Sequence, residues 1–421
     1  MEFNEYLLKD IATIIMGQSP KSEYYSDVNG TPFLQGNRTF NNLYPTIDTY
    51  TTKITKTAEK NDILFSVRAP VGEVNIAPFE LCIGRGLSAI RSKNKDNKFL
   101  HYLLIYKLQD IHSKSTGTIF NSINKSTLEN LEIKIPNEKF QKFIGTLLRN
   151  IDNKIELNNK IIANLEELSQ ILFKRWFVDF EFPDEDGNPY KSSGGEMIDS
   201  ELGKIPLNWN VNALKNIADI RTGYAFKSSE YIYSSKLSVL RTLNISKTSC
   251  LIEMSNLKFV SNDYINIPKY NKYSLEIFDT LLVTVGGSIG NIGIITESNL
   301  PSLQNQNMWR FRTLNSKINN PLIYNIIKII NKNVSNQTSG SAREFYTKKV
   351  FENFKIALPN LNHPMLLKAN QIHLNLFKNI SNLNKETNNL VKLRDTLLPK
   401  LMSGELEISD DVEVNEDELS I

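Results

Sequence analysis

The sequence predicts an α+β protein in which two repeated mixed α/β domains are separated by two long antiparallel coiled-coil helices. Two stretches, at residues 138–178 and 361–403, repeat apolar residues in alternating steps of four and three. The segments that precede these stretches share a series of matched motifs. A stretch rich in turn-forming residues, 179–209, links the two halves. The chain therefore reads as domain, helix, linker, domain and helix.

The first domain is expected at residues 1–137, where strands are more evident than helices. Short β-prone segments bounded by Gly, Pro, Asn or Asp occur at residues 33–34, 63–67 and 131–135. Residues 99–111 are a candidate helix. We place the end of the domain at Pro136 and Asn137, because proline stops the last strand before the long helix begins.

The first long helix is expected at residues 138–178. Its apolar positions follow a heptad seam that only Lys154 and Asn158 interrupt. The seam consists of Phe140, Ile144, Leu147, Ile151, Ile161, Leu165, Leu168 and Leu172. A helix of about forty residues spans about 60 Å, and such a seam needs a partner to cover it.

The second domain, expected at residues 210–360, repeats the plan of the first. The offset between matched motifs grows from 206 to 217 to 223, as loop insertions in the second copy would produce. The matched pairs are 8–12 with 214–218, Gly17 with Gly223, 62–64 with 279–281, Gly72 with Gly290, 115–117 with 338–340, and 131–137 with 354–360. The side chains between these anchors differ widely, so we expect one scaffold to perform two related tasks.

The second long helix is expected at residues 361–403, and Ser403-Gly404 is a typical helix end. Thr387 and Arg394 are the polar breaks in its seam. The residues that keep the spacing are Leu366, Ala369, His373, Leu376, Ile380, Leu383, Leu390, Leu397 and Leu401. Because both seams are too apolar to face water, we expect the two helices to pack on each other and to run antiparallel.

Charge is unevenly distributed along the chain. The net charge is +3, but the tail at 404–421 holds eight acidic residues and no Lys or Arg. The remainder has 49 basic residues against 38 acidic ones, a net charge of +11. A body of that sign is compatible with a polyanionic partner, although many Lys-rich soluble proteins bind no nucleic acid. The composition of the tail predicts a solvated end that is dispensable for folding.

The composition also sets the expected compartment. No apolar run approaches the length of a membrane span, and the N-terminal residues lack the pattern of a signal peptide, so we expect a cytoplasmic protein without membrane contact. Cys82 and Cys250 lie far apart in the sequence, which suits a reducing compartment. With four scattered histidines they form no metal-ligand spacing, and we expect no metal site.

No enzyme signature emerges from the sequence. The glycine-rich run at 285–290 lacks the ending of a P-loop, and its first-copy counterpart at 68–72 keeps only the last glycine. A turn that connects two strands is the better interpretation. Asn188-Pro189-Tyr190 resembles part of an adenine methyltransferase motif but lacks its second proline and lies in the linker. We therefore expect no catalytic residues.

Polar and basic side chains cluster in both repeated domains. Arg, Lys, Asn and Gln are the residues that read base edges, although for any single one of them solvated loop surface is the commoner explanation. The candidates in the first domain are Gln18, Lys21, Gln35, Asn37, Arg38, Arg68, Arg85, Lys114 and Lys125. The candidates in the second domain are Lys227, Arg241, Asn244, Gln304, Gln306, Arg310, Arg343 and Lys348.

An aromatic block ends the first long helix. Trp176, Phe177 and Phe180 stand beside Lys174 and Arg175. They are candidates for partner docking, and the competing interpretation is a buried core under Leu397 to Leu401. Dense aromatics are usually buried, so the core interpretation is favoured.

The central stretch resembles the specificity (S) subunit of type I restriction-modification systems. The segments that carry the resemblance are 156–158, 165–166, 172–180, 189–196 and 201–209. The duplicated plan of domain and helix extends it over nearly the whole chain. One departure is that the Gln expected after the strand-ending proline is only loosely represented by Gln141 and is missing from the second copy.

The resemblance implies a specificity chain that is not itself an enzyme. Each repeated domain would be a target recognition domain that reads one half of a bipartite, asymmetric site in double-stranded DNA. The paired helices would dock two modification (methyltransferase) subunits, which use S-adenosylmethionine to methylate adenine. Restriction subunits would add translocation and cleavage with ATP and Mg²⁺. A specificity chain of a methyltransferase-only system and a coiled-coil adaptor that never touches DNA remain alternatives.

Overall fold

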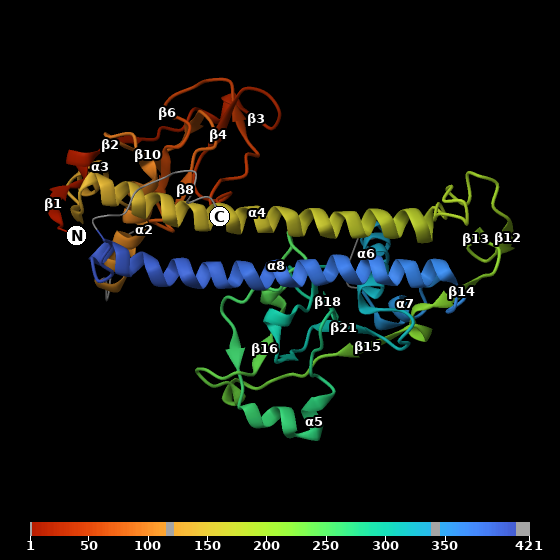
Figure 1. The fold of residues 1–421 in the computed structure, drawn as a ribbon. Coiled ribbons are helices and arrows are strands. Elements are labelled where there is room, and N and C mark those ends of the chain that lie inside the picture. The colour runs from red at the N-terminus through yellow and green to blue at the C-terminus, as the bar shows by residue number, and fades with distance from the viewer. Residues whose placement is uncertain (1, 115–121, 338–345, 410–421) are drawn as a thin grey trace. The chain divides into compact units, whose positions relative to one another are not determined.

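A computed structural model describes residues 2–114, 122–337 and 346–409 (Figure 1). The chain forms two compact units. The first consists of Met1–Leu157 and Asn389–Ile421, and the second of Asn158–Asn388. Two long helices, α4 (Glu138–Phe173) and α8 (Pro364–Ser403), each contribute one part to each unit.

The first unit contains three sheets. Strands β1 (Asn4–Leu7) and β11 (Glu132–Ile135) pair antiparallel. A four-stranded sheet has the order β2 (Ala12–Met16), β10 (Leu87–Ser92), β7 (Ile63–Ser66) and β8 (Val74–Ile76). A five-stranded sheet has the order β3 (Tyr25–Ser26), β5 (Tyr50–Thr51), β4 (Thr31–Leu34), β9 (Leu81–Ile83) and β6 (Thr57–Ala58). The helices are α1 (Leu8–Ile11), η1 (Ser22–Tyr24), α2 (Asn97–Lys114) and α3 (Lys125–Glu129).

Strand β7 of the four-stranded sheet is buried along its whole length, which explains its apolar run from Ile63 to Phe65. Ile63 and Phe65 point into a core that helices α2, α4 and α8 complete. Leu64, between them, points into a second core under β4 and β9. Gly145 of α4 permits close approach of α2, because a Cβ there would lie 2.5 Å from the backbone nitrogen of Phe99.

The second unit repeats this arrangement. Strands β14 (Trp209–Ala213) and β22 (Lys355–Pro359) pair antiparallel. A four-stranded sheet has the order β15 (Ala218–Thr222), β21 (Met308–Thr313), β18 (Thr280–Val283) and β19 (Ile292–Ile294). A three-stranded sheet has the order β17 (Lys258–Phe259), β16 (Ser238–Leu240) and β20 (Ser302–Gln304).

The linker and the helices complete the second unit. The linker holds a hairpin of β12 (Met197–Ser200) and β13 (Gly203–Pro206). The α-helices are α5 (Pro268–Asn271), α6 (Asn320–Gln337) and α7 (Lys348–Glu352). The 3₁₀ helices are η3 (Leu214–Asn216), η4 (Ser228–Glu230), η5 (Thr242–Asn244), η6 (Asn262–Asn266) and η7 (Glu297–Asn299).

The internal repeat is confirmed by one matched ion pair. In the first unit, buried Asp62 accepts hydrogen bonds from Arg91 Nε and Nη2 at 2.6 and 2.7 Å. In the second unit, buried Asp279 accepts the same two bonds from Arg312 at 2.7 and 2.5 Å. The matched Asp-x-Leu motifs therefore fix the same strand contact twice. The predicted match of 115–117 with 338–340 lies outside the described residues.

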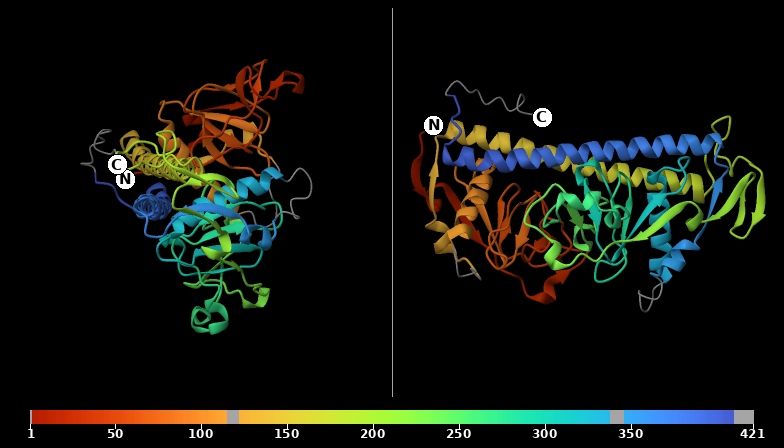
Figure 2. Two further views of the ribbon diagram at one scale, coloured as in Figure 1. Left: turned by 90° about the vertical axis from the view of Figure 1, so that its right-hand side faces the viewer. Right: turned by 90° about the horizontal axis from the view of Figure 1, so that it is seen from below.

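The two long helices pack antiparallel, as predicted (Figures 1 and 2). In the second unit, Asn158 Nδ2 of α4 donates to Thr387 Oγ1 of α8 at 3.3 Å, and Ser169 Oγ lies 2.8 Å from His373 Nδ1. Partner numbers on α8 thus fall as numbers on α4 rise. Asn158 and Thr387 are predicted polar breaks, so the two interruptions meet across the helix pair.

The seam predicted for α4 is wrong in its later part. The predicted Leu168 is exposed, whereas Ser169 and Phe173 are buried. The inward positions are Phe140, Ile144, Leu148, Ile151, Ile155, Asn158, Ile162, Leu165, Ser169 and Phe173. Their nine steps span 33 residues, about 3.7 residues per step, which exceeds the 3.5 of a strict heptad. The seam therefore drifts around the helix, and a polar residue replaces a leucine in the interior.

The aromatic block belongs to the core of the second unit. Helix α4 passes into a π-helical turn, η2 (Lys174–Val178). Trp176 and Phe177 are only 8% and 2% exposed, and the Phe177 ring stacks on Phe173 with centroids 4.7 Å apart. Phe180 is half-buried against Trp209. These placements favour the core interpretation over the docking assignment of Trp176 and Phe177.

The expected cover of this block is wrong. Leu398 and Leu401 lie in the core of the first unit, whereas Met365 and Leu366, at the start of α8, belong to the same core as Trp176. An antiparallel pair brings the beginning of α8, and not its end, to the end of α4.

The described part of the acidic tail is not wholly solvated. Ile408 is buried in the core of the first unit, and the Leu406 backbone N–H donates to Lys400 O at 3.1 Å. The rest of the tail, 410–421, lies outside the described residues. Among the residues that the structure describes, no helix combines the length and apolar character needed to cross a membrane.

Candidate nucleic-acid interface

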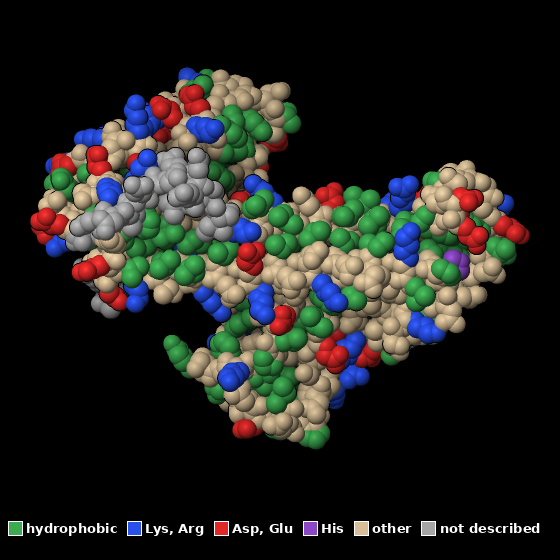
Figure 3. Space-filling model, viewed as in Figure 1, with side chains coloured by type: hydrophobic (Ala, Val, Ile, Leu, Met, Phe, Trp, Pro, Cys, Tyr) green, Lys and Arg blue, Asp and Glu red, His purple; other side chains and the backbone are tan. Residues whose placement is uncertain are grey.

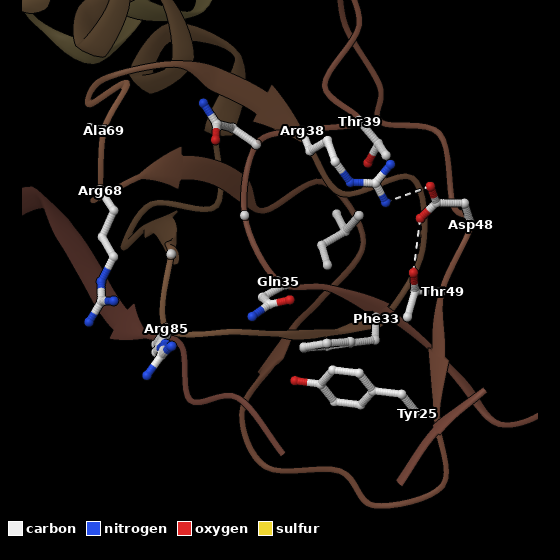
Figure 4. Close-up of a pocket in the computed structure, with 14 residues that line it drawn as sticks. Tyr25, Phe33, Gln35, Arg38, Thr39, Asp48, Thr49, Arg68, Ala69 and Arg85 are labelled. Carbon is white, nitrogen blue, oxygen red and sulfur yellow. Dashed lines mark hydrogen bonds and ion pairs between the residues drawn. The ribbon is translucent and has the colours of Figure 1, made fainter. Parts of the chain in front are cut away.

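Three loops of the first unit surround a cavity of about 420 Å³ (Figure 4). They follow strands β4, β7 and β9, of which β4 and β9 pair in one sheet and β7 belongs to the four-stranded sheet. Five residues that the sequence analysis selected as candidates line this cavity, namely Gln35, Asn37, Arg38, Arg68 and Arg85. The fold thus gathers side chains that the sequence places as much as fifty residues apart.

Backbone hydrogen bonds hold the loops in place. The Gly84 N–H donates to Leu34 O at 2.8 Å, the Gly86 N–H to Gln35 O at 3.2 Å, and the Val67 N–H to Gly86 O at 2.9 Å. Glycine is required because a Cβ on Gly84 or Gly86 would lie 2.8 or 2.7 Å from backbone atoms of Gln35. The Arg85 side chain between these glycines is exposed.

The charged groups at the cavity divide into paired and unpaired ones. Arg38 Nη2 donates to Asp48 Oδ2 at 2.6 Å, and this hydrogen bond lowers the pKa of Asp48. Asn37 Nδ2 donates to Glu73 Oε2 at 2.7 Å. The exposed guanidinium groups of Arg68 and Arg85 have no hydrogen-bond or ion-pair partner among the described residues. Figure 4 shows their side chains extending toward the same side of the cavity.

The other candidates of the first unit lie outside this cavity. Gln18 is exposed, and its backbone N–H donates to Ile83 O at 2.9 Å. Lys21 lies 3.9 Å from Glu23, and Lys125 lies 3.5 Å from Glu129 on α3, all four side chains being partly or largely exposed. The Lys114 side chain is outside the described part of the structure.

The second unit builds the corresponding loops with the same backbone bonds. The Asn305 N–H donates to Leu240 O at 3.0 Å, as Gly84 does to Leu34. The Thr284 N–H donates to Asn307 O at 3.0 Å, as Val67 does to Gly86. The Tyr224 N–H donates to Gln304 O at 3.1 Å, as Gln18 does to Ile83. These bonds define equivalent positions without reference to side chains.

The side chains at equivalent positions differ in chemistry. The pairs, first unit before second, are Gln18 and Tyr224, Gln35 and Arg241, Arg68 and Val285, and Arg85 and Gln306. Gln306 is exposed, and its backbone N–H donates to Tyr224 O at 2.9 Å. Val285 is 41% exposed. The scaffold is thus constant while its exposed side chains vary.

Three candidates of the second unit belong to the scaffold, and their burial argues against the predicted role in DNA binding. Asn244 is buried, and its Nδ2 donates to Glu253 O and Ser255 O, both at 3.0 Å. Gln304 is buried, and its Nε2 donates to Met308 O at 2.8 Å. Arg310 is buried against Asp219, and burial lowers the pKa of Arg310. These side chains already form hydrogen bonds or an ion pair with groups of the protein itself.

The remaining candidates of this unit lie at its surface. Arg241 is half-buried, and its Nη2 donates to Asn256 O at 2.5 Å. Lys227 is exposed at the start of η4. Lys348 lies 3.4 Å from Glu352 on α7. Arg343 lies outside the described residues.

A cluster of aromatic residues beside Tyr224 was missed by the sequence analysis. Lys269 Nζ donates to the Tyr224 hydroxyl at 2.9 Å and lies 5.1 Å from the centroid of the Tyr270 ring. The hydrogen bond from Lys269 lowers the pKa of Tyr224. In the sequence, this aromatic cluster could have been found from five tyrosines within fifty residues, namely Tyr224, Tyr231, Tyr264, Tyr270 and Tyr273. Such a basic and aromatic surface can face phosphates and bases.

The glycine-rich run at 285–290 is a turn between β18 and β19, as predicted. The Gly290 N–H donates to Val283 O at 2.9 Å, which matches the bond from Gly72 to Ser66 O in the first unit. Both glycines have positive φ, at +86° and +94°. Within the described ranges, no group of His, Cys, Asp and Glu could hold a metal ion.

A separate apolar surface lies at the end of α4 in the second unit (Figure 3). Leu168 and Ile171, which are three residues apart on α4, are 43% and 55% exposed, and Val178, in the π-helical turn that follows, is 43% exposed. Lys174 and Arg175 are exposed beside them. We call Leu168, Ile171 and Val178 the α4 surface. Neighbouring exposed apolar residues of this kind mark candidate protein-binding sites.

The comparisons with known proteins agree with this architecture. A family model described as "Type I restriction modification DNA specificity domain" matches residues 1–167 and 206–393. The MjaX specificity subunit of Methanocaldococcus jannaschii is 46% identical over 157 residues, 37% of either chain. The type I restriction enzyme MjaIX specificity subunit of the same organism is 27% identical and covers 96% of this chain and 93% of its own.

A solved structure supports the same fold. The type I restriction-modification S subunit from M. genitalium has a TM-score of 0.59 and 19% identity, and the match covers 97% of both chains. The two stretches matched by the family model correspond to the two copies of the repeated domain, each with most of its long helix. The chain therefore belongs to the family of type I restriction-modification specificity subunits.

Proposed function

We propose that this chain is the non-catalytic, DNA-reading subunit of a cytoplasmic type I restriction-modification complex. Each unit reads one half of a bipartite, asymmetric site in double-stranded DNA. The observation that carries this proposal is the duplicated loop scaffold, in which identical backbone bonds present different exposed side chains. Two reading surfaces with different chemistry recognise two different half-sites.

The residue types at these loops suit contacts with bases in the major groove. Arg68, Arg85 and Gln35 carry the donors and acceptors that pair with base edges, and they are exposed around one cavity. Basic side chains on the body of the protein favour association with phosphates. Phosphate contacts supply affinity, whereas the loop side chains supply sequence preference.

The long helices serve as the platform for partner subunits. Two modification subunits, which use S-adenosylmethionine to methylate adenine, dock on these helices. Restriction subunits add translocation and cleavage with ATP and Mg²⁺. The α4 surface supports this role, because Leu168, Ile171 and Val178 remain exposed on a helix whose opposite face is buried. No cofactor is assigned to this chain itself.

An exchange of domains tests the proposal. The chain is co-expressed with the modification subunit of its own system in a host free of adenine methylation, and modified adenines are mapped by single-molecule sequencing. We expect one bipartite motif. Replacing residues 1–137 with the equivalent domain of a relative should change one half-site and leave the other unchanged.

Two results would contradict the proposal. A change in both half-sites on exchange of one domain would show that the units do not read independently. A complex whose binding to duplex DNA does not weaken with salt, and which leaves no methylation motif, would favour the adaptor role. If the chain belongs to a methyltransferase-only system, the same methylation motif is expected, but the complex does not cleave DNA.

A further inference from the structure

We infer that the first unit reads a G·C pair through Arg85, and that the second unit reads an A·T pair through Gln306 at the equivalent position. This inference rests on the proposed function and assigns base chemistry to each half-site. It names two residues that determine specificity, one in each reading surface.

The equivalence of the two positions comes from the backbone. Arg85 lies two residues after the end of β9, and Gln306 lies two residues after the end of β20. Each of these strands pairs in parallel with its neighbour, β4 in one unit and β16 in the other. The residue that precedes each position donates its N–H to the last carbonyl of that neighbour, Leu34 or Leu240. Both side chains therefore leave the scaffold from the same point.

Arg85 is free to bind a base. Its backbone N–H donates to Ser19 Oγ at 3.1 Å, which fixes the main chain, while its guanidinium group has no partner within the described ranges. A guanidinium fork matches O6 and N7 of guanine with two parallel hydrogen bonds. Arg68, on the adjacent loop, is likewise exposed and unpaired among described residues and lines the same cavity. The first surface thus offers two guanine-reading groups.

The second surface lacks an equivalent guanidinium. Where the first unit has Arg68 and Arg85, the second has Val285 and Gln306, both exposed. A glutamine amide pairs with N6 and N7 of adenine, and an apolar side chain contacts the methyl group of thymine. Both substitutions therefore change the preferred pair in the same direction, from G·C to A·T.

Three other arginines of the second unit already have protein partners. Arg241 is half-buried and donates to Asn256 O at 2.5 Å, buried Arg310 pairs with Asp219, and Arg312 pairs with buried Asp279. Removing Arg310 or Arg312 from its carboxylate partner would leave a charged group unpaired in the interior. Within the described part of the second unit, Gln306 is therefore the exposed side chain best placed to read a base edge.

Reciprocal substitutions test the inference in the assembled complex. Arg85→Gln and Gln306→Arg are each introduced into the full chain, which is co-expressed with its modification subunit. Adenine methylation is then mapped across the genome of the host. Both residues are exposed, so neither change disturbs the core. Lys60→Gln, which removes one exposed charge from the first unit at a residue outside the candidate interface, is the control for charge alone.

We expect Arg85→Gln to replace G by A at one position of one half-site, and Gln306→Arg to replace A by G at one position of the other. Discrimination between the two bases should shift by about 5- to 150-fold at each position. Lys60→Gln should leave the motif unchanged.

The inference is overturned if Arg85→Gln weakens methylation at all sites equally without changing the motif, because that result identifies a phosphate contact. It is also overturned if the half-site altered by Arg85→Gln contains no guanine or cytosine in the parent motif. If the parent complex methylates no specific motif, the proposed function fails and the inference fails with it. An intact parent motif with unaltered variants refutes the inference alone.

Discussion

Acidification should destabilise the second unit through His373. This side chain is buried between α4, α6 and α8, and burial lowers its pKa to about 4. Asn325 Nδ2 donates to Ser169 Oγ at 2.9 Å, so the Ser169 hydroxyl is left to donate to His373 Nδ1 at 2.8 Å. If Nδ1 were protonated, its N–H would face the Ser169 hydroxyl and the Asn325 amide nitrogen, which both act as donors here. The folded state therefore requires the neutral ring.

The sign and size of the effect follow from the two pKa values. An unfolded histidine titrates near 6.5, so between pH 6.5 and 4 the unfolded chain binds more protons than the folded one. The contribution of His373 to stability is complete above pH 6.5 and declines as the pH falls. The expected loss is about 2 kcal/mol at pH 5 and about 3 kcal/mol once the pH reaches 4.

Tryptophan fluorescence isolates the unit concerned, because Trp176, Trp209 and Trp309 all belong to the second unit. Urea unfolding followed by this signal is compared at pH 7.5 and pH 5 for the parent and for His373→Asn, which keeps an acceptor near the Nδ1 position. The stability difference between the two proteins should shrink by about 2 kcal/mol on acidification.

Nuclear magnetic resonance gives an independent readout of the same ring. The chain has four histidines, so labelled imidazole carbons give few signals to assign. The signal that disappears in His373→Asn should keep its neutral position down to pH 5. Parallel stability profiles for the two proteins, or a His373 midpoint near 6.5, would refute the reasoning.

Three further predictions concern packing and docking. Trp176→Ala should lower the unfolding free energy by about 3–5 kcal/mol in urea denaturation, because the indole is buried. Unchanged stability together with lost binding to the modification subunit would support the docking role instead. Ile171→Ser, on the α4 surface, should leave stability within about 0.5 kcal/mol but weaken co-purification of the modification subunit, and undiminished co-purification would rule out this surface. Truncation before Glu405 should lower the unfolding free energy by about 1.5–3 kcal/mol, because it removes buried Ile408, whereas truncation after Ser409 should leave stability unchanged. Equal melting temperatures of the two truncated proteins in thermal unfolding would contradict the assigned packing.

The sequence was sufficient to predict the duplicated plan and the antiparallel helix pair. Matched motifs and two apolar seams are local patterns, and the structure confirms both. The prediction for the later part of the α4 seam was wrong because the residue that points inward there, Ser169, is polar. Its partners, His373 and Asn325, come from two other helices, and no periodicity within α4 could indicate them.

The candidate interface shows a different limit. Residue type selected Gln35, Arg68 and Arg85, which the fold brings to one cavity. The same criterion selected Gln304 and Arg310, whose side chains are buried. An amide or guanidinium that braces a loop has the same letter in the sequence as one that faces solvent. Only the positions of the surrounding carbonyls and carboxylates distinguish them.

The tyrosine cluster was missed for a related reason. Tyr224 and Tyr270 are 46 residues apart, and no short motif joins them. Their contact with Lys269 depends on how the loops of the second unit fold back on one another.

Backbone hydrogen bonds hold the loops that carry residues 68, 85, 285 and 306 in place. Because Val67 to Gly86 and Thr284 to Asn307 are joined through backbone atoms, the fold imposes little constraint on the side chains that those loops expose. Positions such as 68, 85, 285 and 306 can accumulate substitutions with little loss of stability, whereas Asp62 and Asp279 cannot. On the proposed function, selection for a new recognition sequence acts on residues that are nearly neutral for folding. Lineages could then diversify their DNA targets quickly while the scaffold remains recognisable.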